Sequence, residues 1–318
     1  MRFLLVLLAF LTSSSAMAQD FIGARALSMG EAYRAIATGN DALYFNPAGL
    51  PTLKRYALEG QYLLSLSDEN HQGDISVVDS KTSPLAVGLA YTFQGSELTR
   101  RATIGHTATF GIAYPVFDKL FSIGAGLKYK NVSDAIAGNF LNAVTADVGM
   151  LSIIPGGLRL AAVGYNLVPI KTVQSSYVPI SAAFAAALDL GPLSALIFGG
   201  NPRFGAVQTA AGIPTQTMGD LSGPLDNMTV SFDWLINFQT LLGTKSRLSG
   251  GFEWLVAELV PVRAGYLYDE LSGDQRVSAG IGVVIPSFGL DVAYSQSIIA
   301  DTLERRSISF ALKGFLPL

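Results

Sequence analysis

The sequence predicts an all-β fold, a transmembrane antiparallel β-barrel of about fourteen strands. Three observations carry this prediction. The chain opens with an export signal, half of its residues are hydrophobic, and long stretches alternate between apolar and small or polar residues. After the signal, no uninterrupted apolar run reaches the ~20 residues that a membrane-spanning helix needs. A barrel accounts for these features, because only every second residue of a strand faces lipid.

Residues 1–18 have the features of a secretory signal peptide. Arg2 provides the positive start, residues 3–11 are apolar, and Ala16-Met17-Ala18 matches a small-residue cleavage site. This order of features disfavours the alternative, a buried N-terminal helix. We therefore expect export to the outer membrane, cleavage after Ala18, and three regions: a signal peptide at 1–18, an N-terminal segment at 19–55 and a barrel at 56–318.

Period-two alternation marks the expected strands. In the first of them, Leu58 and Tyr62 share one phase, whereas Glu59 and Gln61 share the other. Most such segments run close to the ten or so residues that a tilted transmembrane strand needs. The segments are 56–65, 72–79, 84–94, 101–114, 120–131, 141–152, 158–168, 179–189, 227–239, 246–256, 260–269, 275–286, 288–296 and 305–315.

The connections also fit a barrel, in which periplasmic turns are short and outside loops are longer. Residues 115–119 and 286–287 read as short turns, and 133–139 and 297–304 as longer polar loops. Residues 190–226 do not fit, since a long loop without structure of its own argues against an assignment. This region either hides another strand pair or forms an inserted plug.

A soluble β-sandwich is the alternative fold, because it also produces alternation. Its outward phase would carry many charges, whereas the second phase here is mostly Gly, Ala, Ser and Thr. We therefore expect the apolar phase to face lipid and the small or polar phase to face the lumen. Arginine should then be tolerated less well at Ile123 and Phe232 than at Gly124 and Ser231.

Two short motifs near the N-terminus carry a resemblance to a known family. Residues 23–33 read GARALSMGEAY and residues 41–50 read DALYFNPAGL. Together they resemble the N-terminal hatch of the long-chain fatty acid transporter (FadL-like) superfamily, which includes aromatic-hydrocarbon channels and accessory barrels of type IX secretion. The most specific element is Asn46-Pro47-Ala48-Gly49. Residues 113–120, 157–162 and 262–266 also look like parts of that group.

The resemblance implies a fourteen-stranded barrel whose lumen is plugged by residues 19–55. Two short helical pieces are expected in this hatch, near 26–37 and 41–44. Asn46 suits a turn that bonds to nearby backbone, Pro47 fixes its conformation, and Gly49 permits close approach of another chain segment. Such a plug would bury apolar residues that a free tail would leave in water.

The lumen phase carries charges of both signs. These charges either hold the hatch through salt bridges with Arg25, Glu31, Arg34 and Asp41, or simply line a water-filled lumen. The predicted lumen charges are Glu59, Lys128, Lys130, Asp147, Asp233, Arg247, Glu253, Arg263, Asp291 and Lys313. The tyrosines and tryptophans fall mostly in the apolar phase, which is typical of interfacial girdles in contact with outer-membrane lipid.

Enzymatic and nucleic-acid functions are disfavoured. The chain has no cysteine and only two histidines, His71 and His106, and no local signature supports a Ser–His dyad. The net charge of −3 is too small to indicate a nucleic-acid partner. We therefore expect no catalytic residues, no metal site and no cofactor.

Two functions remain open. The first is a passive channel that carries hydrophobic small molecules across the outer membrane. The second is a structural or accessory barrel that binds proteins of an envelope-spanning secretion or surface-motility complex, which the short loops favour. The hatch motif is shared by both classes, and we favour the channel slightly.

Overall fold

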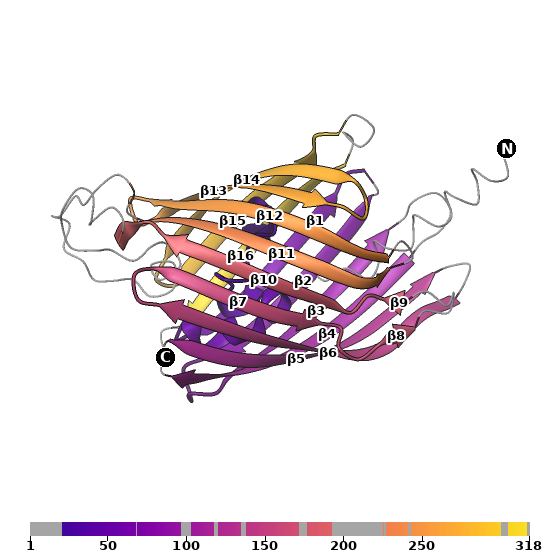
Figure 1. Cartoon of the computed structure of the whole chain (residues 1–318), viewed down its shortest axis with the longest axis horizontal. Coiled ribbons are helices and arrows are strands. Elements are labelled where there is room, and N and C mark those ends of the chain that lie inside the picture. The colour runs from indigo at the N-terminus through magenta and orange to yellow at the C-terminus, as the bar shows by residue number, and fades with distance from the viewer. Residues whose placement is uncertain are drawn as a thin grey trace.

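The computed structural model describes residues 21–67, 69–96, 103–117, 120–134, 138–171, 177–192, 225, 227–240, 243–299 and 305–316. The predicted signal peptide and most of residues 190–226 lie outside these ranges. The described chain forms one closed antiparallel barrel, and a further two-stranded sheet lies beside it (Figure 1). Among the described residues, no helix is both long enough and apolar enough to span a membrane.

Fourteen strands close the barrel, as the alternation predicted. Each strand pairs with its neighbours in the chain, except that β7 pairs with β10, and β1 pairs with β16 to close the wall. The barrel strands are β1 (Tyr56–Ser65), β2 (Asn70–Asp79), β3 (Ala86–Ser96), β4 (Thr103–Phe117), β5 (Phe121–Asp134), β6 (Gly138–Ile154), β7 (Leu158–Tyr165), β10 (Ser181–Asp189), β11 (Met228–Thr240), β12 (Gly243–Val256), β13 (Val260–Asp269), β14 (Asp274–Ile285), β15 (Phe288–Ser297) and β16 (Arg306–Leu316).

We call the end at which β1 begins and β16 ends the near end, and the opposite end the far end. Two predicted connections are corrected. Both ends of the polar stretch 133–139 belong to strands, because β5 and β6 pair as far as Asp134 and Gly138. The predicted turn 115–119 begins inside β4, where the register shifts between Pro115 and Phe117; a bulge is a position at which a sheet tolerates proline.

The short strands β8 (Ile170–Lys171) and β9 (Tyr177–Val178) were not predicted, because two residues are too few to show alternation. They pair with each other in the connection between β7 and β10. Ile170 and Val178 pack with Val132 and Leu141 in a buried apolar cluster beyond the far end of β7.

The two faces of the wall differ as the alternation predicted. Every barrel strand exposes large apolar side chains on its outer face, including Ile123 on β5 and Phe232 on β11. The residues between them, such as Glu59, Asp233 and Arg263, are buried. A sandwich would place the apolar phase inside, so the outer face identifies a transmembrane barrel.

Residues 21–55, which we call the lumen segment, lie inside the barrel (Figure 1). They form α2 (Ala24–Ser28), η2 (Gly39–Asp41), α3 (Ala42–Phe45) and η3 (Pro47–Thr52). The helix expected at 26–37 ends by Ser28, because Gly30 and Glu31 have φ angles of 61° and 67°. Such positive φ values lie outside the helical region and turn the chain back.

Candidate functional site

The lumen segment is the most completely buried part of the described chain. Almost every residue from 21 to 53 is buried, and several of these residues are charged. On one side of the lumen, η3 and α3 lie against β3–β6, whereas α2 lies against β13–β16 on the other. The segment therefore reaches from one wall of the barrel to the opposite wall.

A buried ionic network fixes α2 to the wall. The Arg25 guanidinium bonds to both carboxylate oxygens of Glu253, with Nη2–Oε1 and Nε–Oε2 distances of 2.7 and 3.0 Å. Glu253 also accepts from Arg263, whose Nη1 lies 2.6 Å from Asp291 Oδ1. Burial by itself would lower the pKa of Arg25, but the adjacent Glu253 carboxylate, together with Tyr33 and Asp291, raises that pKa well above its ordinary value.

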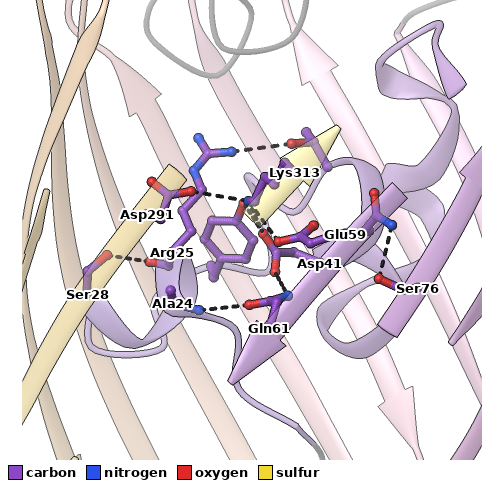
Figure 2. A network of polar contacts seen from close by, with 12 residues as sticks. Ala24, Arg25, Ser28, Asp41, Glu59, Gln61, Ser76, Asp291 and Lys313 are labelled. Atoms are coloured by element: carbon purple, nitrogen blue, oxygen red, sulfur yellow. Dashed lines mark hydrogen bonds and ion pairs between the residues drawn. The ribbon is translucent and has the colours of Figure 1, made fainter. Parts of the chain in front are cut away.

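Lys313 extends this network across the lumen. Its Nζ lies 3.4 Å from Asp41 Oδ2, 3.2 Å from Glu59 Oε1 and 3.4 Å from Asp291 Oδ2. Figure 2 shows Lys313 between these three carboxylates, one from the lumen segment and two from the wall. A single cation therefore links η2 to β1 and β15, and the low dielectric of the site strengthens these contacts.

The chain turn after α2 is anchored on β11 and β12. Asp233 Oδ2 accepts hydrogen bonds from the backbone N–H groups of Tyr33 and Arg34 and from Arg34 Nη1. Arg247 lies between Glu31 and Asp269, with N–O distances of 2.9 and 3.0 Å. Because partners are present for these buried charges, the desolvation penalty of each is offset.

The Asn46-Pro47-Ala48-Gly49 element forms a tight turn against β5 and β6. Asn46 Oδ1 accepts from Ala48 N, and Asn46 Nδ2 donates to the carbonyls of Arg34 and Met150 at 3.1 and 3.2 Å. Pro47 begins η3, where its missing N–H costs nothing. A Cβ on Gly49 would lie 2.0 Å from the Ala37 carbonyl oxygen, so this position requires glycine.

Glycines in the wall admit the backbone of the lumen segment. A Cβ on Gly124 would lie 2.4 Å from the Pro47 carbonyl carbon, and one on Gly149 would lie 2.1 Å from Asn46 Oδ1. On the opposite wall, a Cβ on Gly265 would lie 2.1 Å from Gly30 N. Because a side chain at Gly124 would collide with Pro47, we expect arginine there to be disruptive, in contrast to the prediction from its inward position alone.

The predicted lumen charges divide into two groups. Seven of them belong to the networks that hold the lumen segment: Glu59, Asp233, Arg247, Glu253, Arg263, Asp291 and Lys313. Lys128 and Asp147 instead pair with each other at 2.5 Å, and Lys130 is buried on the same strand as Lys128. All four charged residues expected to bind the wall, Arg25, Glu31, Arg34 and Asp41, have partners there.

Sequence reasoning missed several inward-facing polar residues. Asp74 accepts from Tyr44 and Thr92, and Arg159 pairs with Asp189 at 3.0 Å. Burial, with the Asp74 carboxylate adding to it, raises the pKa of the Tyr44 phenol well above its ordinary value. The alternation along β2 and β7 could have identified them, since Asp74 and Arg159 alternate with the outward residues Ile75 and Leu160.

The two histidines lie on the outer face, each beside a tyrosine of the neighbouring strand. The Tyr62 hydroxyl is 2.5 Å from His71 Nδ1, and the Tyr91 hydroxyl is 2.6 Å from His106 Nδ1. Both pairs lie towards the far ends of β1–β4, where an aromatic side chain with a polar partner suits a membrane interface. Among the described residues, each histidine thus bonds to a tyrosine.

No protein-family model and no curated protein matches this sequence. Solved structures match its fold. The toluene transporter TbuX of Ralstonia pickettii has a TM-score of 0.64 at 11% identity, over 94% of this chain and 99% of that one.

Two further structures give the same result. The monoaromatic hydrocarbon channel CymD has a TM-score of 0.64 at 12% identity, over 94% of this chain and 98% of that one. A FadL homologue of Pseudomonas aeruginosa has a TM-score of 0.62 at 11% identity, over 92% and 97%. These likenesses show the fold alone, which is the closed β-barrel of these transporters.

Proposed function

We propose that this chain is a passive outer-membrane channel for hydrophobic small molecules, and that the lumen segment is its hatch. The observation that carries the proposal is the burial of residues 21–53 across the lumen of a FadL-like barrel. TbuX and CymD, two barrels of similar fold, are described as a toluene transporter and a monoaromatic hydrocarbon channel.

The distribution of polarity supports a membrane location. Large apolar side chains cover the outside of every barrel strand, whereas charges are buried inside. Together with the predicted export signal, this favours the outer membrane. The near end would face the periplasm, because β1 begins there and β16 ends there. A solute would enter from the far end and move down its concentration gradient.

The hatch supports selectivity. Ion pairs and hydrogen bonds to both walls keep it in the lumen, so small ions and sugars meet a filled barrel. A hydrophobic solute needs only a transient path between packed side chains. Because these contacts keep the lumen filled, we do not expect the barrel to act as a general pore for small polar solutes.

Toluene consumption by whole cells tests the proposal. A Gram-negative host that oxidises toluene in its cytoplasm is supplied with low toluene concentrations, so that passage through the outer membrane limits the rate. Cells that produce this chain should consume toluene several-fold faster than cells that produce an equal amount of an unrelated porin. Equal rates would refute the channel function and favour the accessory-barrel alternative.

A further inference from the structure

We propose that hydrophobic solutes pass the lumen segment along one sector of the wall, formed by the inner faces of β7 and β10. This inference rests on the proposed channel function and adds its route. We call the inward-facing apolar residues of this sector the alanine lane; they are Ala161, Val163, Ala183, Ala185 and Ala187.

The lane is continuous across the two strands. Ala161 lies opposite Ala185 in the ladder, and Val163 lies opposite Ala183. All five side chains are buried. Ala161, Ala185 and Ala187 belong to the same apolar cluster as Tyr33, Ile36 and Phe45 of the lumen segment. Along Ala161, Ala185 and Ala187, the wall and the lumen segment therefore share one apolar cluster.

Polar anchors border the lane on both sides. On β6, the Met150 carbonyl accepts from Asn46, and Gly149 admits the Asn46 side chain. On β11, Asp233 binds Tyr33 and Arg34 through three hydrogen bonds. Separation of the lumen segment from either neighbouring strand would leave buried polar groups without partners, which is strongly unfavourable.

The polar groups of β7 and β10 lie at the ends of the lane. At the far end, the Tyr165 hydroxyl accepts from Arg34 Nε at 2.8 Å and donates to the Phe45 carbonyl. At the near end, Arg159 and Thr229 both bond to Asp189, within the wall. Between these ends, no hydrogen bond or ion pair is described between the lane side chains and the lumen segment, and Val163 and Ala183 pack with Tyr165 and Leu235 in a small apolar cluster of their own.

This arrangement makes the lane a sector where a path opens at low cost. Apart from the two hydrogen bonds of Tyr165 at its far end, hatch and wall lose only apolar contacts here when they separate, and a hydrophobic solute replaces those contacts. A polar solute or ion would find no hydrogen-bonding partner along the alanines and would be excluded. The small size of alanine also leaves space as soon as the lumen segment shifts.

The absence of cysteine from the sequence allows a direct test. Ala185→Cys places one thiol in the lane. Ala293→Cys is the control, since Ala293 is also buried, at 1% exposed against 6% for Ala185, and belongs to the same apolar cluster, but lies on β15 between Asp291 and Ser295. Heat-modifiable migration on gels confirms that both variants are folded, and each is then treated with N-ethylmaleimide, with and without toluene.

We expect Ala185→Cys to react several-fold faster than Ala293→Cys and toluene to slow only the former reaction. After labelling, cells with Ala185→Cys should lose their faster toluene consumption, whereas cells with Ala293→Cys should keep it. Equal labelling at both positions, labelling unaffected by toluene, or full consumption after labelling of Ala185→Cys would overturn the route. Toluene consumption by the unmodified chain tests the channel function separately.

Discussion

Arg25 and Glu253 are 228 positions apart in the sequence and form a bidentate ion pair inside the barrel. The pair joins α2 of the lumen segment to β12, and both side chains are almost inaccessible to solvent. Arg263 shares the same carboxylate. Glu253 therefore has two partners, Arg25 from the lumen segment and Arg263 from the wall. If Arg25 is replaced, Arg263 still neutralises the Glu253 carboxylate.

Arg25→Gln should weaken the hatch without preventing barrel assembly. Glu253 would keep Arg263 as its partner, so we expect docking of the lumen segment to weaken by about 1–3 kcal/mol. The ion conductance in planar bilayers should rise and fluctuate. Arg305→Gln is the control, because Arg305 is half-exposed and lies 3.6 Å from Asp274; its conductance should match that of the unmodified protein.

Deletion of residues 23–48 should leave a barrel that assembles but conducts ions far better. The fourteen strands pair without this segment, and water can solvate the charges that it would leave in the lumen. Heat-modifiable gel migration reports assembly and planar-bilayer recordings report conductance. If the deleted and intact proteins conduct alike, the segment is not a plug.

Gly251→Ala should displace the lumen segment, whereas Gly250→Ala should not. The two glycines are neighbours on β12, but a Cβ on Gly251 would lie 2.6 Å from the Met29 carbonyl oxygen. A Cβ on Gly250 meets no described atom within 4 Å. We expect higher conductance and faster proteolysis of the segment only for Gly251→Ala, and identical behaviour of both variants would show that the close approach is unimportant.

Asn46→Asp should be more harmful than Asn46→Ala, although aspartate is closer in shape to asparagine. The amide of Asn46 donates to two carbonyl oxygens, and a carboxylate would leave both without a donor and place a negative charge beside them. We expect Asn46→Asp to reduce the stability of the docked lumen segment by about 1–3 kcal/mol. The measurement is the urea concentration at which half of the segment becomes exposed. If Asn46→Asp and the unmodified protein had the same urea midpoint, the amide of Asn46 would not have the role that we assign to it.

Phe232→Arg should destabilise the barrel by about 2–4 kcal/mol if the side chain lies near the bilayer midplane. Phe232 is on the outer face of β11, with 51% of its surface exposed, so the arginine would face lipid. Phe232→Leu retains an apolar side chain and serves as the control. Unfolding in urea from lipid bilayers measures both, and equal stability would argue against a lipid-facing position.

The strands and their faces follow from the sequence by itself. Alternation is a local property with a period of two, so Ile123 and Phe232 could be assigned to the outer face before any pairing was known. The sequence also singled out residues 19–55, because they lack alternation yet contain apolar residues that must be buried. The predicted strand bounds differ from the observed ones by at most three residues.

Only the tertiary structure decided which groups meet inside the barrel. Arg25 pairs with Glu253, whereas Lys128 pairs with Asp147, because barrel closure and strand stagger set the depth and sector of each inward side chain. Alternation places Gly251 in the inward phase of β12, but only the tertiary structure shows that the Met29 carbonyl lies against it. The alanine lane likewise exists only because β7 and β10, separated in the chain by residues 166–180, are paired in the wall. Such relationships depend on contacts between distant parts of the chain, which local periodicity does not encode.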